Sequence, residues 1–476
     1  MDYEIVIGLE VHTHMKTNSK MFCSCSTEFG AEQNTQTCPI CLGMPGVLPV
    51  INEKAVELAV RCAIGLACKK IEGRNVFSRK HYYYPDLPKN FQITQYDLPL
   101  GEHGELKISE NKTVKIKRVH MEEDAGKLVH SGDGIEGSTY SLVDLNRTGT
   151  PLLEIVTEPD IFSPEEAYLY LMTLKKVLEY LDISDCDMEK GNLRCDANIS
   201  IRKKGEPLGV KAELKNMNSF KAVQVALDYE AKRQEEILNE GKKIAQETRL
   251  WDEKIGKTIS MRSKEEAHDY RYFPEPDLAP VEISKEFIAE ILKTMPELPE
   301  VRKKRFIEAY GLPEYDAGVL TSERGFADYF EVCAKMCDSP KSAGNWIMTG
   351  LLGLLNQKNM LIAESKVTPE KLAEMIKLID NKTISGKMAK EIFSEMFVTG
   401  KTAKEIISSK GMTQITDESE IEKIVLQAIN DNPKAIADFR SGNQNAVTFL
   451  AGQVMRITKG KANPQTVNKI IKEKMK

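Results

Sequence analysis

The opening run of the chain alternates between apolar and polar side chains. Within residues 5–12, Leu9 and Val11 point to one side of an extended strand, whereas Glu10 and His12 point to the other. The pattern predicts a half-buried strand. Its polar face brings a carboxylate and an imidazole close together.

Two later segments also predict strands that carry acids. The segments 118–124 and 150–156 contain Glu123 and Glu154, and Glu154 interrupts an otherwise apolar run. A carboxylate in such a run loses several kcal/mol of hydration on burial, so a cation or a hydrogen-bond donor must compensate it. A divalent metal ion or an arginine side chain meets this need.

The acids of these strands, with the imidazole, form a candidate magnesium site. Carboxylate oxygens are hard ligands that suit Mg²⁺, and a histidine either binds the ion directly or holds a coordinated water. The alternative is that each acid is ion-paired within the fold, as many buried acids are. The predicted ligands and catalytic residues are Glu10, His12, Glu123 and Glu154.

Two cysteine pairs near the N-terminus have the spacing of a second metal site. A CxC and a CxxC motif are separated by 12 residues rich in Gly, Asn, Gln and Thr. This spacing suits a structural zinc ion bound by four thiolates. The alternatives are a redox pair or free thiols, but no thioredoxin-like context surrounds the CxxC motif. The predicted ligands are Cys23, Cys25, Cys38 and Cys41.

A hairpin is predicted farther along, from alternation in 193–201 and again in 210–214. One face of this hairpin carries both cations and acids. Such a face either is solvated or lines a cleft, where its cations hold phosphates of ATP or tRNA. The candidate phosphate-binding residues in the chain are Lys80, Arg194, Lys211, Lys215 and Arg271.

The spacing of apolar residues then changes from strands to helices. Ser163 and Ser219 begin two helical segments within the strand-rich part, and several prolines mark a boundary near residue 293. Helical segments follow, and a turn-rich stretch covers 400–417. The expected domains are 1–293, 294–405 and 406–476, the last a small helical tail.

Composition adds limits to this picture. A chain of 476 residues with 41% hydrophobic residues exceeds one compact core, and its net charge of −5 argues against a generally basic surface. Residues 440–476 nevertheless hold eight Lys or Arg residues against one acid, Glu473. This excess is either a solvated helical end or a patch that binds phosphates. The absence of a long apolar segment or a signal pattern predicts a cytoplasmic protein with reduced cysteines.

One apparent nucleotide-binding motif fails on inspection. Gly256, Lys257 and Thr258 imitate the end of a phosphate-binding loop, but Trp251 stands where its first glycine must be. No Gly-x-Gly-x-x-Gly follows a strand either. ATP is therefore expected on an antiparallel sheet, held through magnesium and basic side chains.

Several long strings resemble one family, GatB, which is the B subunit of the aspartyl/glutamyl-tRNA amidotransferase in the GatCAB complex. The resemblance covers the whole chain. The strings are IGLEVH (7–12), PGVLPV (45–50), HMEEDAGK (120–127), SLVDLNR (141–147), LRCDANIS (193–200), AELKN (212–216) and DYRYFPEPD (269–277). One departure is His81, where the family commonly has asparagine.

The resemblance implies a glutamine-dependent carbon–nitrogen ligase. ATP would phosphorylate the side-chain carboxylate of Glu or Asp misacylated on tRNA, and ammonia would displace the phosphate. It implies an α+β fold: an N-terminal cradle related to glutamine synthetase and guanidino kinases, a helical domain, and a YqeY-like tail that contacts tRNA. It also implies magnesium on the four predicted ligands.

Ammonia must come from a partner, because the chain carries no glutaminase signature. The resemblance implies that the amidase, or A, subunit is its source and that the small C subunit completes a heterotrimer. Two other functions remain open from the residues: a non-catalytic, zinc-bearing tRNA adaptor, and a free-standing amino-acid ligase. Transfer of phosphate from ATP to aminoacyl-tRNA distinguishes the first alternative, and activity on free glutamate distinguishes the second.

Overall fold

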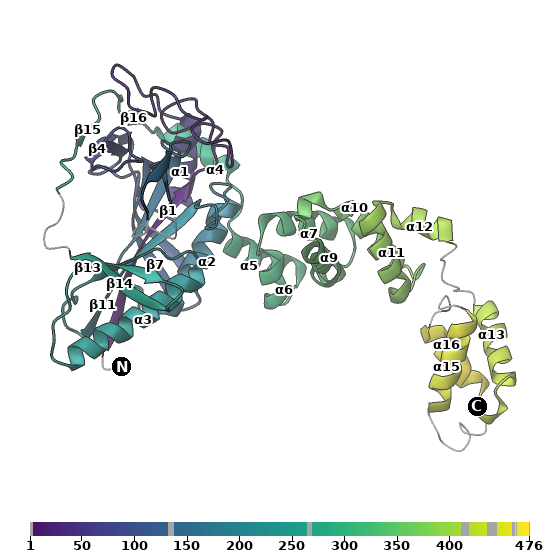
Figure 1. Ribbon diagram of the computed structural model, residues 1–476. Helices are drawn as coiled ribbons and strands as arrows, with labels where there is room; N and C mark the ends of the chain where they lie inside the picture. The colour runs from purple at the N-terminus through teal and green to yellow at the C-terminus, as the bar shows by residue number, and fades with distance from the viewer. Residues whose placement is uncertain are drawn as a thin grey trace. The chain divides into compact units, whose positions relative to one another are not determined.

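The computed structural model divides the chain into two compact units, Met1–Leu298 and Pro299–Lys476 (Figure 1). It describes residues 3–131, 138–263, 269–410, 418–435, 445–458, 462 and 464–475. The first unit combines a large sheet with helices, and the second is helical. The expected α+β class is therefore confirmed.

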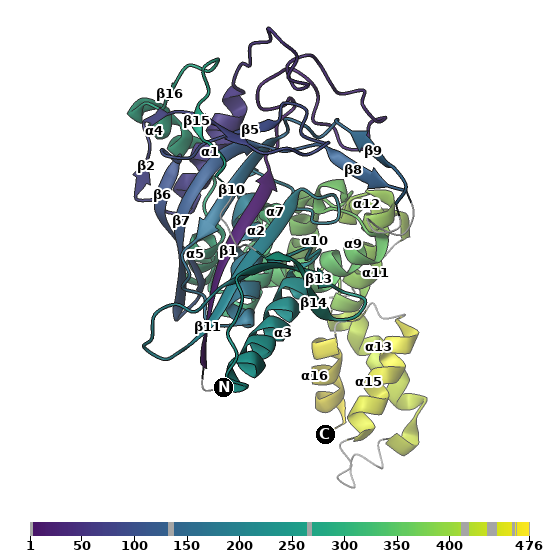
Figure 2. The same cartoon turned by 60° about the vertical axis from the view of Figure 1, so that its left-hand side comes forward.

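A 12-stranded sheet forms the centre of the first unit, in the order β14-β13-β12-β11-β1-β10-β7-β5-β4-β15, with β6 also on β7 and β2 on β6. The pairs are antiparallel except for β12 and β13, which run parallel. β1 lies in the middle of the sheet, between β10 and β11 (Figure 2). The strands are β1 (Tyr3–His14), β2 (Lys70–Ile71), β4 (Ser78–His81), β5 (Phe91–Thr94), β6 (Gly101–Ser109), β7 (Lys112–Glu123), β10 (Pro151–Thr157), β11 (Leu193–Lys203), β12 (Ala212–Lys215), β13 (Glu247–Asp252), β14 (Lys257–Ser263) and β15 (Phe273–Pro274).

Two small sheets lie outside this path. β3 (Arg74–Asn75) pairs with β16 (Val281–Glu282), and β8 (Lys127–His130) pairs with β9 (Ser141–Asp144). The predicted hairpin is confirmed, because β11 and β12 pair antiparallel.

Helices share the core with one face of the large sheet. Leu9 and Val11 are fully buried against residues of α1 (Glu53–Gly65), α2 (Pro164–Tyr180) and α3 (Phe220–Asn239). The two serines predicted to begin helices do so: the Ser163 and Ser219 hydroxyls accept hydrogen bonds from the Glu166 and Ala222 N–H groups. The other face of the sheet is left for polar side chains.

The first unit ends with a helix that the sequence pattern did not predict. α4 (Lys285–Thr294) packs Ile291 into the same core, so the expected boundary at 293 falls inside this helix. The unit continues to Leu298. The prolines of this region mark the approach to the boundary and not its position.

The second unit contains two separate hydrophobic cores. The first involves α5 (Pro299–Tyr310), α6 (Glu314–Leu320), α7 (Arg324–Met336), α8 (Pro340–Asn345), η1 (Trp346–Leu351), α9 (Leu352–Lys358), α10 (Pro369–Asp380), α11 (Gly386–Thr399) and α12 (Ala403–Lys410). The stretch expected to be turn-rich is thus helical from Ala403 to Lys410, because Ala403, Ile406 and Ile407 are buried in this core. The expected boundary at 405/406 divides α12, and 411–417 lie outside the described residues.

The second core is formed by α13 (Glu418–Asn430), α15 (Asn445–Ile457) and α16 (Pro464–Lys474). Of the expected basic residues here, Arg440, Lys459, Lys461 and Lys476 lie outside the described residues. Lys474 forms an ion pair with Glu422, so this lysine is at least partly neutralised. Over the described residues, no helix is both long enough and apolar enough to span a bilayer.

Candidate functional site

A row of polar side chains crosses the centre of the sheet on the face away from the helices. His12 on β1 lies opposite Glu154 on β10, and Glu154 lies opposite His120 on β7. The cause is the alternation already seen in the sequence: Leu9 and Val11 fill the core, so their neighbours face the other way. Three strands from distant parts of the chain therefore place these side chains side by side.

Glu122 joins this row from the end of β7. The Nε2 atom of His12 is 3.4 Å from a Glu154 carboxylate oxygen and 3.7 Å from one of Glu122. Ligand atoms of His12, Glu122 and Glu154 all lie within 4.8 Å of one another. We call these three residues the carboxylate cluster.

Two basic side chains support Glu154 from beside the cluster. His120 Nε2 lies 3.2 Å from Glu154 Oε2, and Arg118 Nη2 lies 3.5 Å from Oε1. Burial disfavours ionisation of Glu154, but the adjacent His120 and His12 outweigh it and hold the pKa of Glu154 well below its ordinary value. Burial likewise opposes protonation of His12, yet Glu154 and Glu122 raise the pKa of its imidazole. The carboxylate of Glu154 is thus kept ionised.

The carboxylate cluster has the donor set of a divalent metal site. Two buried carboxylates and one imidazole suit a hard ion that also keeps water ligands. The alternative from the sequence, ion pairing with arginine, also holds for Glu154, although its contact with Arg118 is long at 3.5 Å. A metal ion and Arg118 would thus both offset the negative charge of the Glu154 carboxylate.

The structure does not bring Glu123 into this cluster. Glu123 points to the opposite face of β7, where it pairs with Lys89 and accepts a hydrogen bond of 3.0 Å from the Ile93 N–H. Consecutive residues of a strand face opposite sides, so only one of the two adjacent glutamates can join His12. Counting in steps of two from His120 finds Glu122, and this correction was available in the sequence.

Glu10 also stays outside the cluster. It lies on the same face as His12, one step of the alternation away, and its Oε1 accepts a hydrogen bond of 2.9 Å from the Asn198 side chain. Of the four predicted ligands, the structure thus brings together only His12 and Glu154.

The predicted phosphate-binding cations fall into two groups. Arg194 lies 2.8 Å from Asp124, and Lys215 pairs with Asp196 and Glu213. By contrast, Lys80, Lys211 and Arg271 form no ion pair with any residue in the described ranges.

Sequence reasoning missed a second polar network beside the carboxylate cluster. Asp124 accepts from His14 at 2.7 Å and from Arg194 at 2.8 Å, and lies 3.4 Å from Arg147. Burial opposes its ionisation, but Arg194, His14 and Arg147 together hold the pKa of Asp124 well below its ordinary value. The sequence contains a signal for this network. His14 lies two residues after His12, and Asp124 lies two residues after Glu122, so the period of two places each on the polar face of its strand.

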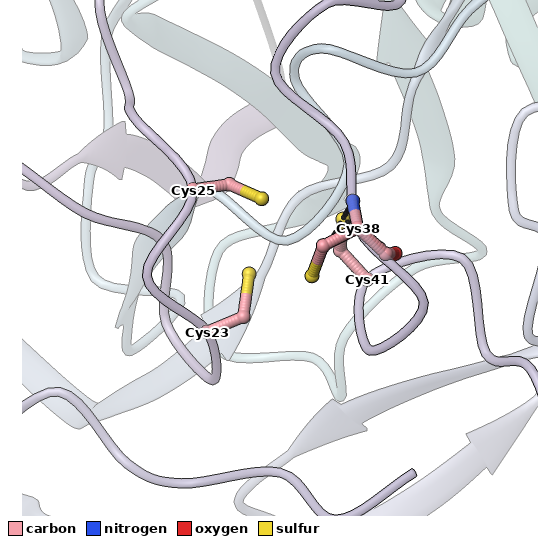
Figure 3. Close-up of side chains that lie close together, drawn as sticks. All are labelled: Cys23, Cys25, Cys38 and Cys41. Atoms are coloured by element: carbon pink, nitrogen blue, oxygen red, sulfur yellow. Dashed lines mark hydrogen bonds between the residues drawn. The ribbon is translucent and has the colours of Figure 1, made fainter.

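The four predicted cysteines do converge. Figure 3 shows Cys23 and Cys25 on one loop and Cys38 and Cys41 on another, with their sulfur atoms turned toward a shared space. All four sulfur atoms lie within 4.8 Å of one another, and tetrahedral zinc–thiolate bonds of about 2.3 Å need sulfur atoms roughly 3.8 Å apart. We call these residues the cysteine cluster.

The surroundings of Cys41 favour a thiolate. The largest effect is a hydrogen bond from the Cys23 thiol to the Cys41 sulfur, followed by one from the Cys38 N–H and by the positive charge of Lys20. Burial acts in the opposite direction, but together these groups lower the pKa of Cys41 to about 4. Lys20 is itself buried, and its Nζ lies 3.6 Å from the Cys41 sulfur. The CxxC residues lie in turns and not at a helix start, the usual place of a redox pair. A metal centre therefore fits better than a redox pair.

Together, the fold and these clusters define an α+β protein with two candidate metal centres, one of carboxylate and imidazole and one of thiolates. Comparison with known sequences identifies its family. The GatB/GatE catalytic domain matches residues 5–289, and the GatB domain matches residues 328–475. The chain belongs to the GatB family, as the sequence strings predicted.

Curated relatives match over their full length. A protein of Carboxydothermus hydrogenoformans is 56% identical over 478 residues, covering 100% of this chain and 99% of the relative. A protein of Brevibacillus brevis is 55% identical, with 99% of this chain and 98% of the relative covered. Both are named as the B subunit of an aspartyl/glutamyl-tRNA(Asn/Gln) amidotransferase.

Proposed function

We propose that this chain is one subunit of a glutamine-dependent carbon–nitrogen ligase that amidates Glu-tRNA(Gln), Asp-tRNA(Asn) or both with the use of ATP. The observation that carries the proposal is the carboxylate cluster, a compact donor set on the polar face of the sheet in a chain of the GatB family. The family relation supports aminoacyl-tRNA as the substrate, and the carboxylate cluster supports a reaction with ATP that uses a metal ion.

The reaction must first activate a carboxylate, which is a poor electrophile because oxide cannot leave. A carboxylate oxygen of the aminoacyl group attacks the γ-phosphorus of ATP, the bond to the bridging oxygen breaks, and ADP leaves. The resulting acyl phosphate is attacked by ammonia at its carbonyl carbon. A carbon–nitrogen bond forms, inorganic phosphate departs, and the nitrogen loses a proton.

His12, Glu122 and Glu154 are the proposed magnesium ligands. When bound there, the ion neutralises charge on the transferring phosphoryl group. Arg118 and His120 hold Glu154 in place by their contacts of 3.5 and 3.2 Å. The proposed role of Glu10, on the same face of the sheet, is to hold the Asn198 side chain in place through their hydrogen bond.

The free cations are proposed to meet phosphate groups. Lys80, Lys211 and Arg271 have no carboxylate partner among the described residues, so phosphate oxygens can occupy their hydrogen-bonding capacity. Arg194 and Lys215 are already paired with acids, and their proposed role is to keep those acids oriented.

The cysteine cluster is proposed to hold one structural zinc ion. Four converging thiols with one strongly acidic member match a closed four-thiolate site. The ion would join two loops that lack regular secondary structure of their own.

The chain is proposed to act with two partners: an amidase, the A subunit, which releases ammonia from glutamine, and a small C subunit. The relatives' name, which makes them one subunit of an enzyme, supports an assembly of several chains. The helical tail, residues 406–476, is proposed as the domain that contacts tRNA, supported by the excess of Lys and Arg residues in 440–476.

A reconstituted assay with the A and C subunits, ATP, glutamine and misacylated tRNA tests this proposal. The complex should form Gln-tRNA or Asn-tRNA and transfer labelled γ-phosphate to the aminoacyl group. Glu154→Gln should slow both steps roughly 10²–10³-fold without slowing glutamine hydrolysis, whereas Glu253→Gln, at an exposed turn, should change none of them. Amide formation at the normal rate by Glu154→Gln would refute the assignment, and tRNA binding without any phosphate transfer by the wild type would favour an adaptor.

A further inference from the structure

Aromatic side chains from two distant segments gather beside the carboxylate cluster. Tyr96 and Tyr272 stack with ring centroids 3.8 Å apart and planes at 7°. Tyr270 lies edge-on to Tyr272 at 6.0 Å and to Tyr82 at 6.3 Å, and Tyr84 continues the series at 5.9 Å from Tyr82. We call these five residues the tyrosine cluster.

The backbone holds the two segments together. The His81 N–H donates to the Tyr270 carbonyl at 3.0 Å, and β15 pairs with β4 directly after the tyrosines. The His81 ring adds a bond from Nδ1 to the Arg271 carbonyl at 3.1 Å and stacks on Phe273 at 5.0 Å. His81, the departure from the family pattern, thus has a place: it fixes the segment that carries Tyr270 and Tyr272.

The tyrosine cluster carries two cations without carboxylate partners. Lys80 Nζ lies 5.1 Å from the centre of the Tyr270 ring and 5.8 Å from that of Tyr82. Arg271 is exposed, and its guanidinium reaches the hydroxyl of Tyr83 at 3.5 Å. Within the described residues neither side chain forms an ion pair, so both remain available to anions.

The tyrosine cluster borders the carboxylate cluster. Thr94 donates to a Glu122 carboxylate oxygen at 3.3 Å, and Tyr96 follows two residues later. The pKa of Tyr272 is raised by burial first, then by its tyrosine neighbours and by the charges of Glu154 and Glu122. A molecule lying on these rings therefore has one end at the proposed magnesium ligands.

We propose that the tyrosine cluster, with Lys80 and Arg271, binds the unpaired 3′ end of the substrate tRNA by stacking its terminal bases. Aromatic rings interleaved with free cations are the usual means of binding single-stranded nucleic acid, with rings for the bases and cations for the phosphates. The inference rests on the proposed function, since the aminoacyl group is esterified to the 3′-terminal nucleotide. Stacking there brings that group to the carboxylate cluster.

The extent of the surface favours several bases over one. Tyr84 is 55% exposed and Tyr96 is 46% exposed, and they stand at opposite ends of the ring series. The adenine of ATP would occupy one ring face and leave the rest open. Two exposed rings at the ends of the series, with Lys80 against the rings between them, match a strand of several nucleotides.

The test compares Tyr96→Leu and Tyr84→Leu with Tyr96→Phe, which keeps the ring, and Tyr315→Leu, which removes a tyrosine of the second unit that is 79% exposed. Each variant is assembled with the A and C subunits. Dissociation constants are measured for fluorescent tRNA with an intact 3′ end and for the same tRNA shortened by its unpaired 3′ nucleotides. KM values for aminoacyl-tRNA and for ATP are measured in parallel.

Both leucine variants should weaken binding of intact tRNA about tenfold, as loss of one base–ring stack does, and raise KM for aminoacyl-tRNA alike. Binding of shortened tRNA and KM for ATP should stay within about twofold, and Tyr96→Phe and Tyr315→Leu should behave as wild type. If Tyr96→Leu fails to fold, Tyr84→Leu tests the same prediction at the other end of the ring series.

Three results separate the inference from the proposed function. Normal binding of intact tRNA by both leucine variants, in a complex that amidates tRNA, overturns the inference alone. A raised KM for ATP with unchanged tRNA binding overturns it in favour of adenine. A wild-type complex that binds tRNA but forms no amide refutes the proposed function, and the comparison of intact with shortened tRNA then still decides what the rings bind.

Discussion

The two candidate metal centres of the first unit are built in opposite ways. The carboxylate cluster takes one ligand from each of three paired strands, so the backbone ladder holds His12, Glu122 and Glu154 with or without an ion. The cysteine cluster takes its ligands from two irregular loops close in sequence, and the sulfur atoms approach one another with no strand ladder between those loops in the described residues. We therefore expect a metal ion at the carboxylate cluster to serve the reaction and a metal ion at the cysteine cluster to stabilise the fold.

The largest expected effect is on catalysis. Glu154→Gln removes a charged ligand but keeps its shape, so amide formation should fall roughly 10²–10³-fold, the usual loss when one charge-stabilising group is removed from an active site. Thermal unfolding should hardly change, because the three-strand ladder remains. If Glu154→Gln instead lowered the melting temperature and left amide formation unchanged, the carboxylate cluster would be structural, like the cysteine cluster.

The adjacent glutamates sharpen the contrast. Glu123→Gln leaves Lys89 buried without its partner and should lower the free energy of unfolding by about 3 kcal/mol. Glu122→Gln should leave unfolding nearly unchanged and lower activity. Denaturant unfolding of both variants measures this, and the double variant Lys89→Met with Glu123→Gln should recover stability if the missing ion pair is the cause.

Removal of metal from the cysteine cluster should act on the fold. Cys38→Ser should lose the zinc found by elemental analysis and lower the free energy of unfolding by about 2 kcal/mol, because the ion joins the two loops. Ser24→Ala, an exposed change between two ligands, is the matched control. A metal-free wild type that melts at the same temperature as the zinc-bound wild type would contradict the structural role.

The smallest expected effect lies outside both centres. Truncation after Lys410 removes the tail and leaves the other two cores intact. Its tRNA affinity should depend less on salt, and the slope of log K against log salt should fall by roughly one for each phosphate that the tail no longer binds. An unchanged slope would assign tRNA binding to the residues that precede the tail.

Local alternation predicted the strands and part of the carboxylate cluster, since the period of two depends only on neighbouring residues. It found the faces of His12 and Glu154 correctly. Which strands pair, and in which register, depends on contacts 100 or more residues apart, as between Glu10 and Val156. The period of two already places Glu122 on the same face as His120, but the pairing that brings His120, Arg118 and Glu122 beside Glu154 could not be predicted from it.

The cysteine cluster was easier to predict, because its ligands are close along the chain and motif spacing suffices. The tyrosine cluster was not predicted: Tyr82 and Tyr270 come together only through the pairing of β4 with β15. Helix α12 was missed because its burial depends on the core it joins and not on its own short sequence.

The most direct test of the central claim is transfer of labelled γ-phosphate from ATP to misacylated tRNA in the complex with the A and C subunits. The wild type should give a labelled acyl phosphate when ammonia and glutamine are withheld. Glu122→Gln should give none, although its complex binds tRNA and, when supplied with glutamine, hydrolyses it normally. Equal labelling by Glu122→Gln would show that the carboxylate cluster does not hold the ion that activates the substrate.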